Sequence, residues 1–292
     1  MSEERQEQSE EERRERELVI RRILVALDTS AHSLAALEAS ARLAAILHAE
    51  LVGLFVEDVN LLRLAALPFT REVRWSSSTR RSLDEARMER ELRLLASQAR
   101  RALALAAEEA ETEWKFRVVR GAVAEEVLRA AMEADLLSLG RASRPLSRRV
   151  RLGSTAQAAA VRGNRSVLLA RKGADLDLPV MVTYDGSDIA PRVLAAAVQM
   201  AHASESNLIV LVVADDADDA PQIAEEASDL LGDQVAHADY RFLPTNGEEH
   251  LPDVLRQERC SVIVLGGEND LLQGERLYRL LDELDCPVLL VR

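Results

Sequence analysis

The chain has 292 residues, of which 48% are hydrophobic and only 3% aromatic, so it is long enough for two ordinary domains with apolar cores. Its 50 acidic and 37 basic residues give a net charge of −13, which argues against general nucleic-acid binding, because that function needs a positive surface. The polar first residues and the lack of any run near 18 apolar residues predict a cytoplasmic protein without a signal peptide or membrane span.

The first half alternates apolar strands with helices after a charged tail. Residues 1–17 contain too few apolar residues to bury a core, so we expect disorder or a frayed helix there. The strand in "RRILVALDTS" runs into Asp28 and into Ser30, which is placed as a helix N-cap. An alanine-rich helix, the strand "ELVGLFV", a long helix near 81–111, "WKFRVVRG", another helix, "DLLSLG", a short helix and "SVLLAR" follow.

The second half repeats this design. Residues 23–56 align without a gap onto residues 180–213, which puts Asp185 and Ser187 in the places of Asp28 and Ser30. Ser187 is therefore also expected to cap a helix. Further helices are expected at 220–232, 247–258 and 271–283, and strands at "ADYRFLP", "SVIVLG" and "PVLLVR". The chain is interpreted as a tandem duplication.

The alternation of helices with strands that are apolar throughout predicts the fold class. Such strands are typical of parallel sheets that are covered on both faces. The sequence therefore predicts an α/β protein of two tandem doubly wound domains, each with a five-stranded parallel sheet and helices on both faces. The domains are expected at residues 18–172 and 178–292, joined by the linker "KGADLDL" at 172–178.

A basic, glycine-bounded loop follows the fourth strand of the first half. The stretch "LGRASRPLSRRVRLGST", residues 139–155, contains five arginines and no acidic residue. Gly140, Ser143, Gly153 and Ser154 are spaced Gly-x2-Ser-x9-Gly-Ser. On these residues the chain, over about residues 20–292, resembles a tandem universal stress protein. The nucleotide-binding branch of that family carries Gly-x2-Gly-x9-Gly-Ser/Thr after the fourth strand.

The resemblance implies an adenine nucleotide, ATP or AMP with or without Mg²⁺, in the first domain. The implied nucleotide-binding residues are Ala26, Leu27, Asp28, Val56, Leu139, Gly140, Ser143, Gly153, Ser154 and Thr155. Asp28, Ala26 and Val56 would hold the adenosine end. The chemistry of the loop agrees, because glycines let backbone N–H groups approach phosphate oxygens and a helix N-terminus attracts anions.

Ser143 departs from the family pattern, where a second glycine stands. A side chain there costs about 1 kcal/mol or more if the bound loop needs a positive φ, and little if φ is negative. Arg141, Arg144, Arg148 and Arg149 supply positive charge that would offset lost backbone contacts. The alternative is that these arginines form a solvated surface that pairs with acidic helices of the same chain.

The second half is expected to have lost the site. Its corresponding stretch, "LGGENDLLQGERLYR", leaves seven residues between Gly266 and Gly274 and carries Glu268, Asp270 and Glu275. Carboxylates repel phosphates, so no cofactor is expected there. Cys260 and Cys286 open apolar runs without a CxxC pattern, and we expect them to be buried, reduced thiols.

Three functions remain open from the sequence. The favoured one is a cytoplasmic stress-response regulator that binds an adenine nucleotide in its first domain. The others are a nucleotide-free interaction protein with two degenerate sites, and a slow ATPase. No catalytic constellation or metal-ligand spacing is recognisable, so an enzyme is the less favoured interpretation, and no nucleic acid or membrane partner is expected.

The resemblance also implies how the domains associate. The family pairs domains through their final strands, so 167–170 and 288–291 are expected to meet across a pseudo-two-fold axis, which would cover two apolar edges. The linker spans about 23–25 Å when extended. Residues 60–75 have no counterpart in the second half. This insertion is expected to cap the first cleft or to form a partner, membrane or homodimer surface, with Leu62 affecting only self-association.

Overall fold

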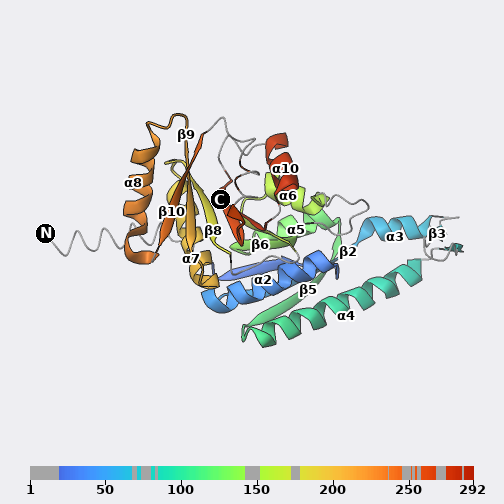
Figure 1. Ribbon diagram of the computed structural model, residues 1–292. Coiled ribbons are helices and arrows are strands. Elements are labelled where there is room, and N and C mark those ends of the chain that lie inside the picture. The colour runs from blue at the N-terminus through green and yellow to red at the C-terminus, as the bar shows by residue number, and fades with distance from the viewer. Residues whose placement is uncertain are drawn as a thin grey trace.

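The computed structural model describes residues 20–67, 71–73, 80–82, 85–141, 152–171, 178–235, 237–244, 251, 254, 258–267, 274–284 and 286–292. A sheet of ten strands runs through the whole molecule, and helices cover both of its faces (Figure 1). The predicted tail at 1–17, most of the linker and most of the predicted helix at 247–258 lie outside the described residues.

The first half supplies five strands of this sheet and a small hairpin. Its elements are β1 (Arg22–Ala26), α2 (Ala31–Leu47), β2 (Glu50–Asp58), α3 (Val59–Ala66), β3 (Arg71–Val73), β4 (Arg80–Ser82), α4 (Glu85–Glu109), β5 (Trp114–Gly121), α5 (Val123–Ala131), β6 (Leu136–Gly140), α6 (Ser154–Arg162) and β7 (Ser166–Ala170). Strands β3 and β4 pair only with each other.

The second half supplies the other five strands. Its elements are β8 (Val180–Tyr184), α7 (Ala190–Ser204), β9 (Leu208–Ala214), α8 (Ala220–Leu231), the short 3-10 helix η1 (Gly232–Gln234), β10 (Ala238–Pro244), β11 (Val262–Gly266), α10 (Gly274–Glu283) and β12 (Val288–Val291).

The strand order is β10-β9-β8-β11-β12-β7-β6-β1-β2-β5, which gives each half the same order when it is read from its outer edge. All neighbours within a half are parallel, and the only antiparallel pair among the sheet's described strands is β7 with β12. In that pair Leu168 lies opposite Leu289. The predicted doubly wound α/β fold and the predicted pairing of the final strands are confirmed.

Two apolar clusters, one on each face, hold the layers together. Helices α2, α4, α7 and α8 pack on one face, and α5, α6 and α10 on the other (Figure 1). Both clusters include residues from both halves, because the strands near the junction are buried on both faces. The antiparallel junction therefore lies inside a continuous core, and it brings the amino end of β12 beside the carboxyl end of β7.

Of the two serines predicted to cap helices, one does so and the other does not. Ser30 caps α2, and its hydroxyl oxygen accepts a hydrogen bond from the backbone N–H of Ser33 at 3.2 Å. Ser187 does not cap α7, which begins three residues later at Ala190. Proline at the second position of α7 explains the later start, because Pro191 lacks an N–H and fits the first turn of a helix, where the N–H has no intrahelical partner.

The insertion after β2 packs against the long helix α4. Helices α3 and α4 run side by side and extend beyond the body of the sheet (Figure 1). Leu62 is 7% exposed, whereas Leu61, Leu64 and Leu67 are between 41% and 56% exposed. The expectation that Leu62 acts only in self-association is therefore wrong: the exposed stripe runs through the other three leucines. Among the described helices, none has the length and apolar character needed to cross a membrane.

Candidate functional site

A cleft of about 520 Å³ opens in the first half at the carboxyl ends of β1, β2 and β6. This is the position at which doubly wound sheets bind ligands, and the volume falls within the roughly 300–1,000 Å³ of small-molecule sites. Helices α3 and α4 line one side of the cleft, and α5 and the start of α6 line others. The cleft is therefore built from strand ends and helices along most of the first half.

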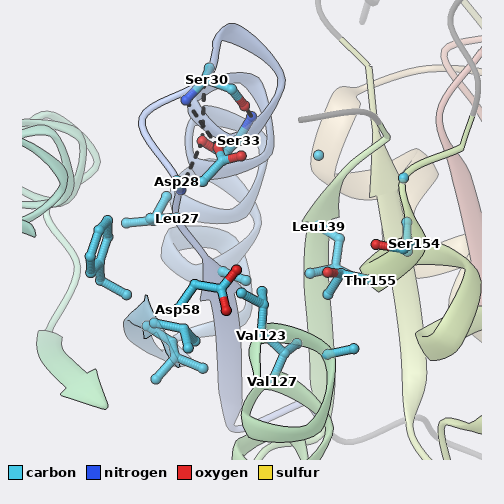
Figure 2. A pocket seen from close by; sticks show the side chains of 18 of the residues that line it. Leu27, Asp28, Ser30, Ser33, Asp58, Val123, Val127, Leu139, Ser154 and Thr155 are labelled. Carbon is cyan, nitrogen blue, oxygen red and sulfur yellow. Dashed lines mark hydrogen bonds between the residues drawn. The ribbon is translucent and has the colours of Figure 1, made fainter. Parts of the chain in front are cut away.

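The predicted nucleotide-binding residues that the structure describes all line this cleft. They are Ala26, Leu27, Asp28, Val56, Leu139, Gly140, Gly153, Ser154 and Thr155. Asp28 lies at the end of β1, and Ser154 and Thr155 lie across the cleft from it at the start of α6 (Figure 2). Ser143, Arg144, Arg148 and Arg149 lie outside the described residues.

The turn after β1 holds the Asp28 side chain in place. The Oδ1 atom of Asp28 accepts a hydrogen bond from the backbone N–H of Ser30 at 3.0 Å, and the Asp28 N–H donates to the Ser33 hydroxyl at 3.3 Å (Figure 2). Thr29, between them, has a φ of 61°, which is a genuine outlier for a β-branched residue. The turn thus carries backbone strain next to the cleft.

Gly140 and Gly153 have different structural roles. A Cβ on Gly140 would lie 2.5 Å from the carbonyl carbon of His32 and 2.7 Å from the backbone nitrogen of Ser33. Only glycine therefore allows β6 to end against the first turn of α2. Gly153 is the N-cap of α6 with a φ of −66°, and its N–H donates to the carbonyl of Arg141 at 2.9 Å. The first turn of α6 lines the cleft from this cap onward, through Ser154, Thr155 and Ala156.

Several lining residues were not predicted. Asp58 and Asn60 come from the end of β2 and the start of α3, and Asp58 Oδ1 accepts a hydrogen bond from the Asn60 N–H at 2.9 Å. Leu61, Leu92 and Leu95 add apolar surface from α3 and α4. The signal for Asp58 was present, since an acidic residue at the carboxyl end of β2 is placed like Asp28 at the end of β1. The insertion thus lines the cleft, as one of its predicted roles required.

The charge around the described cleft is negative. Asp28 and Asp58 both line it, and no Lys, Arg or His is among the described lining residues. Arg141 was predicted to support phosphate binding, but it is 4% exposed and is not among the residues that line the cleft. Its Nη1 donates to the backbone carbonyl of Leu284, in the second half. The predicted positive charge of Arg144, Arg148 and Arg149 at the cleft stays a prediction, because these residues lie outside the described residues.

Both residues that flank 142–151 are bound to the end of α10. Arg141 donates to the Leu284 carbonyl, and the backbone N–H of Leu152 donates to Asp282 Oδ1 at 2.8 Å. The antiparallel β7–β12 pair makes this possible, because it puts the turn between α10 and β12 near the carboxyl ends of β7 and of its neighbour β6, which Arg141 follows. The second half therefore anchors both ends of the segment between Gly140 and Gly153, which we call the glycine loop.

The corresponding strand end in the second half has different side chains. Tyr184 stands in the place of Leu27, is fully buried, and donates its hydroxyl proton to Glu226 Oε1 at 2.7 Å. Gly186 stands in the place of Thr29, with a φ of 71°. The predicted acidic residues Glu268 and Asp270, and the side chain of Glu275, lie outside the described residues, so their effect on ligands stays a prediction. Across the described part of the chain, no three potential metal ligands of the His, Cys, Asp or Glu type gather into one cluster.

Comparison with known proteins relates this fold and cleft to one family. Residues 20–171, the first half, match the model of the universal stress protein family. A universal stress protein from Archaeoglobus fulgidus is similar in structure, with a TM-score of 0.71 and 16% identity over 93% of this chain and 98% of that one. A putative universal stress protein from Pseudomonas aeruginosa gives 0.61 and 15% over 94% of each chain. No curated protein matches the sequence.

Proposed function

The chain belongs to the universal stress protein family, and on that premise we propose that it is a stress-response regulator that binds an adenine nucleotide, ATP or AMP, in the cleft of its first half. The observation that carries the proposal is the lining of one cleft by an acidic strand end, an apolar wall and the N-terminus of α6. These three parts suit, in order, a ribose, a base and phosphates.

The adenosine end would use Asp28, Val56 and the apolar wall. A carboxylate accepts hydrogen bonds from two neighbouring hydroxyl groups, so Asp28 suits the ribose diol. Val123, Val127 and Leu139 provide apolar contact for a planar base (Figure 2). Asp58, at the end of β2, accepts hydrogen bonds and would suit an exocyclic amine.

The phosphate end would use the first turn of α6. The backbone N–H groups of Ser154 and Thr155 and the helix dipole attract anions, and the two hydroxyl groups add donors. Arg144, Arg148 and Arg149 would supply the positive charge that the described lining lacks. Mg²⁺ usually binds through substrate phosphates and water, so it would enter with ATP and would not need a protein cage.

The second half would act in support. We propose that it is a second universal stress domain without a ligand, which covers the final strand of the first and anchors its glycine loop. The paired domains would act as a covalent dimer in the cytoplasm. A further homodimer would use the exposed leucine stripe of α3.

Equilibrium dialysis with radiolabelled ATP and Mg²⁺ tests the proposed binding. Val123→Trp should block the cleft and reduce retention of ATP at least tenfold, because Val123 lines the cleft and a tryptophan there would fill the space proposed for the base. Val161→Trp is the matched control, since Val161 is 39% exposed on α6 and does not line the cleft. No retention by the wild type would favour the nucleotide-free interaction protein, and steady release of ADP would favour the slow ATPase.

A further inference from the structure

Two thiols meet at the turn that anchors the glycine loop. Cys260 precedes β11 and Cys286 precedes β12, and both are free. The parallel register pairs Ile263 with Val288, and the ladder continues beyond it, since the Ile263 N–H donates to the Pro287 carbonyl at 3.0 Å. Both cysteines join the same apolar cluster on the α10 face of the sheet. Their side chains thus share one face and one end of two adjacent strands.

The spacing suits a disulfide. Extending the register places residue 261 beside Cys286, so Cys260 is offset from its neighbour by one position. In regular strands such positions lie about 6 Å apart between Cα atoms, from a strand separation of about 4.8 Å and a rise of about 3.3 Å per residue. A regular strand would turn the two side chains to opposite faces. The backbone is not extended here, since Arg259 has a φ of 48°, and both cysteines pack in the same apolar cluster. Disulfides span Cα separations of about 4.4–6.8 Å.

The surroundings give the two thiols different reactivity. A hydrogen bond from the Cys260 thiol lowers the pKa of Cys286, and Arg141 and Arg171 lower it further, against the effect of burial. The same hydrogen bond, together with burial, raises the pKa of Cys260. Both cysteines are buried, with Cys286 8% and Cys260 6% exposed, so the neighbouring charges and not solvent access distinguish the two thiols. The thiolate is the reactive form, so Cys286 is the nucleophile and Cys260 the resolving thiol.

We propose that Cys260 and Cys286 form a redox-active pair that hydrogen peroxide converts into an intrachain disulfide. The Cys286 thiolate attacks one peroxide oxygen, the O–O bond breaks, and hydroxide leaves as water once protonated. The Cys260 sulfur then attacks the Cys286 sulfenic acid, the S–O bond breaks, and a second water leaves with the Cys260 proton. Two thiols are oxidised by two electrons and one peroxide is reduced to two waters.

Peroxide treatment of the reduced full-length protein tests the pair without any nucleotide. We expect loss of both thiols, an intact mass lower by two hydrogens, and no covalent dimer on a non-reducing gel. Cys260→Ser should stop the reaction at a Cys286 sulfenic acid that dimedone traps, whereas Cys286→Ser should leave Cys260 reduced. Two intact thiols in the wild type, under conditions that oxidise free N-acetylcysteine, would overturn the proposal. Preferential trapping at Cys260 would overturn the assigned roles.

Arg141 gives a second readout. Because its charge favours the Cys286 thiolate, Arg141→Gln should slow the peroxide reaction about threefold or more. Arg162→Gln, an exposed change on α6, should leave the rate unchanged. Equal rates for wild type and Arg141→Gln would contradict the activation of Cys286 by this guanidinium. Thermal melts of both variants separate this effect from unfolding.

The disulfide would also act on the cleft, and this consequence rests on the proposed nucleotide binding. Asp282, at the end of α10, and Leu284, directly after α10, anchor the glycine loop and precede Cys286 by four and two residues. Closing an S–S bond of about 2.05 Å would shift that turn and loosen the anchors. We expect ATP affinity to fall severalfold on oxidation, and not in the Cys260→Ser/Cys286→Ser variant. Absence of ATP binding in both redox states would count against the nucleotide site, while the thiol assay decides the disulfide separately.

Discussion

The two halves of the chain build the same turn after their first strand, but with different side chains. Asp28 and Asp185 each accept a hydrogen bond from the serine N–H two residues later, at 3.0 and 3.1 Å. The residue between has a positive φ in both turns, and it is Thr29 in the first half and Gly186 in the second. The second half thus uses the residue that fits the backbone, whereas the first half keeps a strained one beside an open cleft.

The residue before each aspartate also differs between the two halves, and again the second half has the more tightly held side chain. Leu27 lines the cleft in the first half. Tyr184, its counterpart, is fully buried and hydrogen-bonded to Glu226. Strained backbone and open cavities are typical of functional sites, whereas regions that serve only stability usually have unstrained turns and filled cores. The first half thus combines an open cleft with a strained turn, as the proposed binding site requires, whereas the equivalent strand end of the second half has a buried, hydrogen-bonded tyrosine and an unstrained glycine.

The largest expected effect comes from separating the halves. Leu168 is 3% exposed and lies opposite Leu289 in the antiparallel pair, so Leu168→Asp buries a charge at the junction. We expect a loss of about 4 kcal/mol or more in the free energy of unfolding. Leu94→Asp is the control, because Leu94 is 64% exposed on α4. Thermal melts of both variants measure the difference, and an unchanged melting temperature for Leu168→Asp would refute the junction's role.

Gaining a glycine in the first turn and losing one at the equivalent position of the second should change the free energy of unfolding in opposite directions. Thr29→Gly relieves the positive φ of a β-branched residue and should raise the free energy of unfolding by about 1 kcal/mol. Gly186→Ala should lower it by about 1 kcal/mol. That loss would come from backbone strain, since an added Cβ at 186 meets only Glu226 Oε2, at 3.7 Å. Urea titration gives both values, and a destabilised Thr29→Gly variant would contradict the assigned strain.

A smaller effect is expected at the contact between the second half and the glycine loop. Asp282→Ala removes the acceptor of the Leu152 N–H, so the loop is less well held and ATP affinity should fall about fivefold, which corresponds to about 1 kcal/mol. The neighbouring exposed residue offers the control, Glu283→Ala. Calorimetry with ATP compares the two variants. Equal affinities would show that the second half does not support the site.

The sequence predicted the parts of the fold that local pattern controls. The apolar runs of the sheet and their alternation with helices predicted the doubly wound α/β fold, and the family resemblance predicted the pairing of the final strands. The place of the cleft was predicted because carboxyl strand ends converge in a parallel sheet, whereas its individual residues came from the family resemblance. Ser187 was misplaced because the proline after it shifts the helix start, which depends on two residues at once.

Other features depended on contacts between distant segments. Leu62 was misjudged because "NLLRLAAL" is apolar on nearly every side, so its pattern does not reveal which leucines face α4. Arg141 was placed at the phosphates because its partner, Leu284, is 143 residues away and comes near only through the β7–β12 pair. The proximity of Cys260 and Cys286 likewise follows from strand register and not from their spacing in the chain.

The most direct test of the account is a calorimetric titration of the full chain with ATP, repeated on Asp28→Ala and Asp185→Ala. These aspartates occupy equivalent turns, so the pair compares the two halves with the same chemical change. The account predicts one bound ATP per chain, an affinity at least tenfold weaker for Asp28→Ala, and an unchanged affinity for Asp185→Ala. Two bound ATP molecules per chain, or equal losses in both variants, would contradict it.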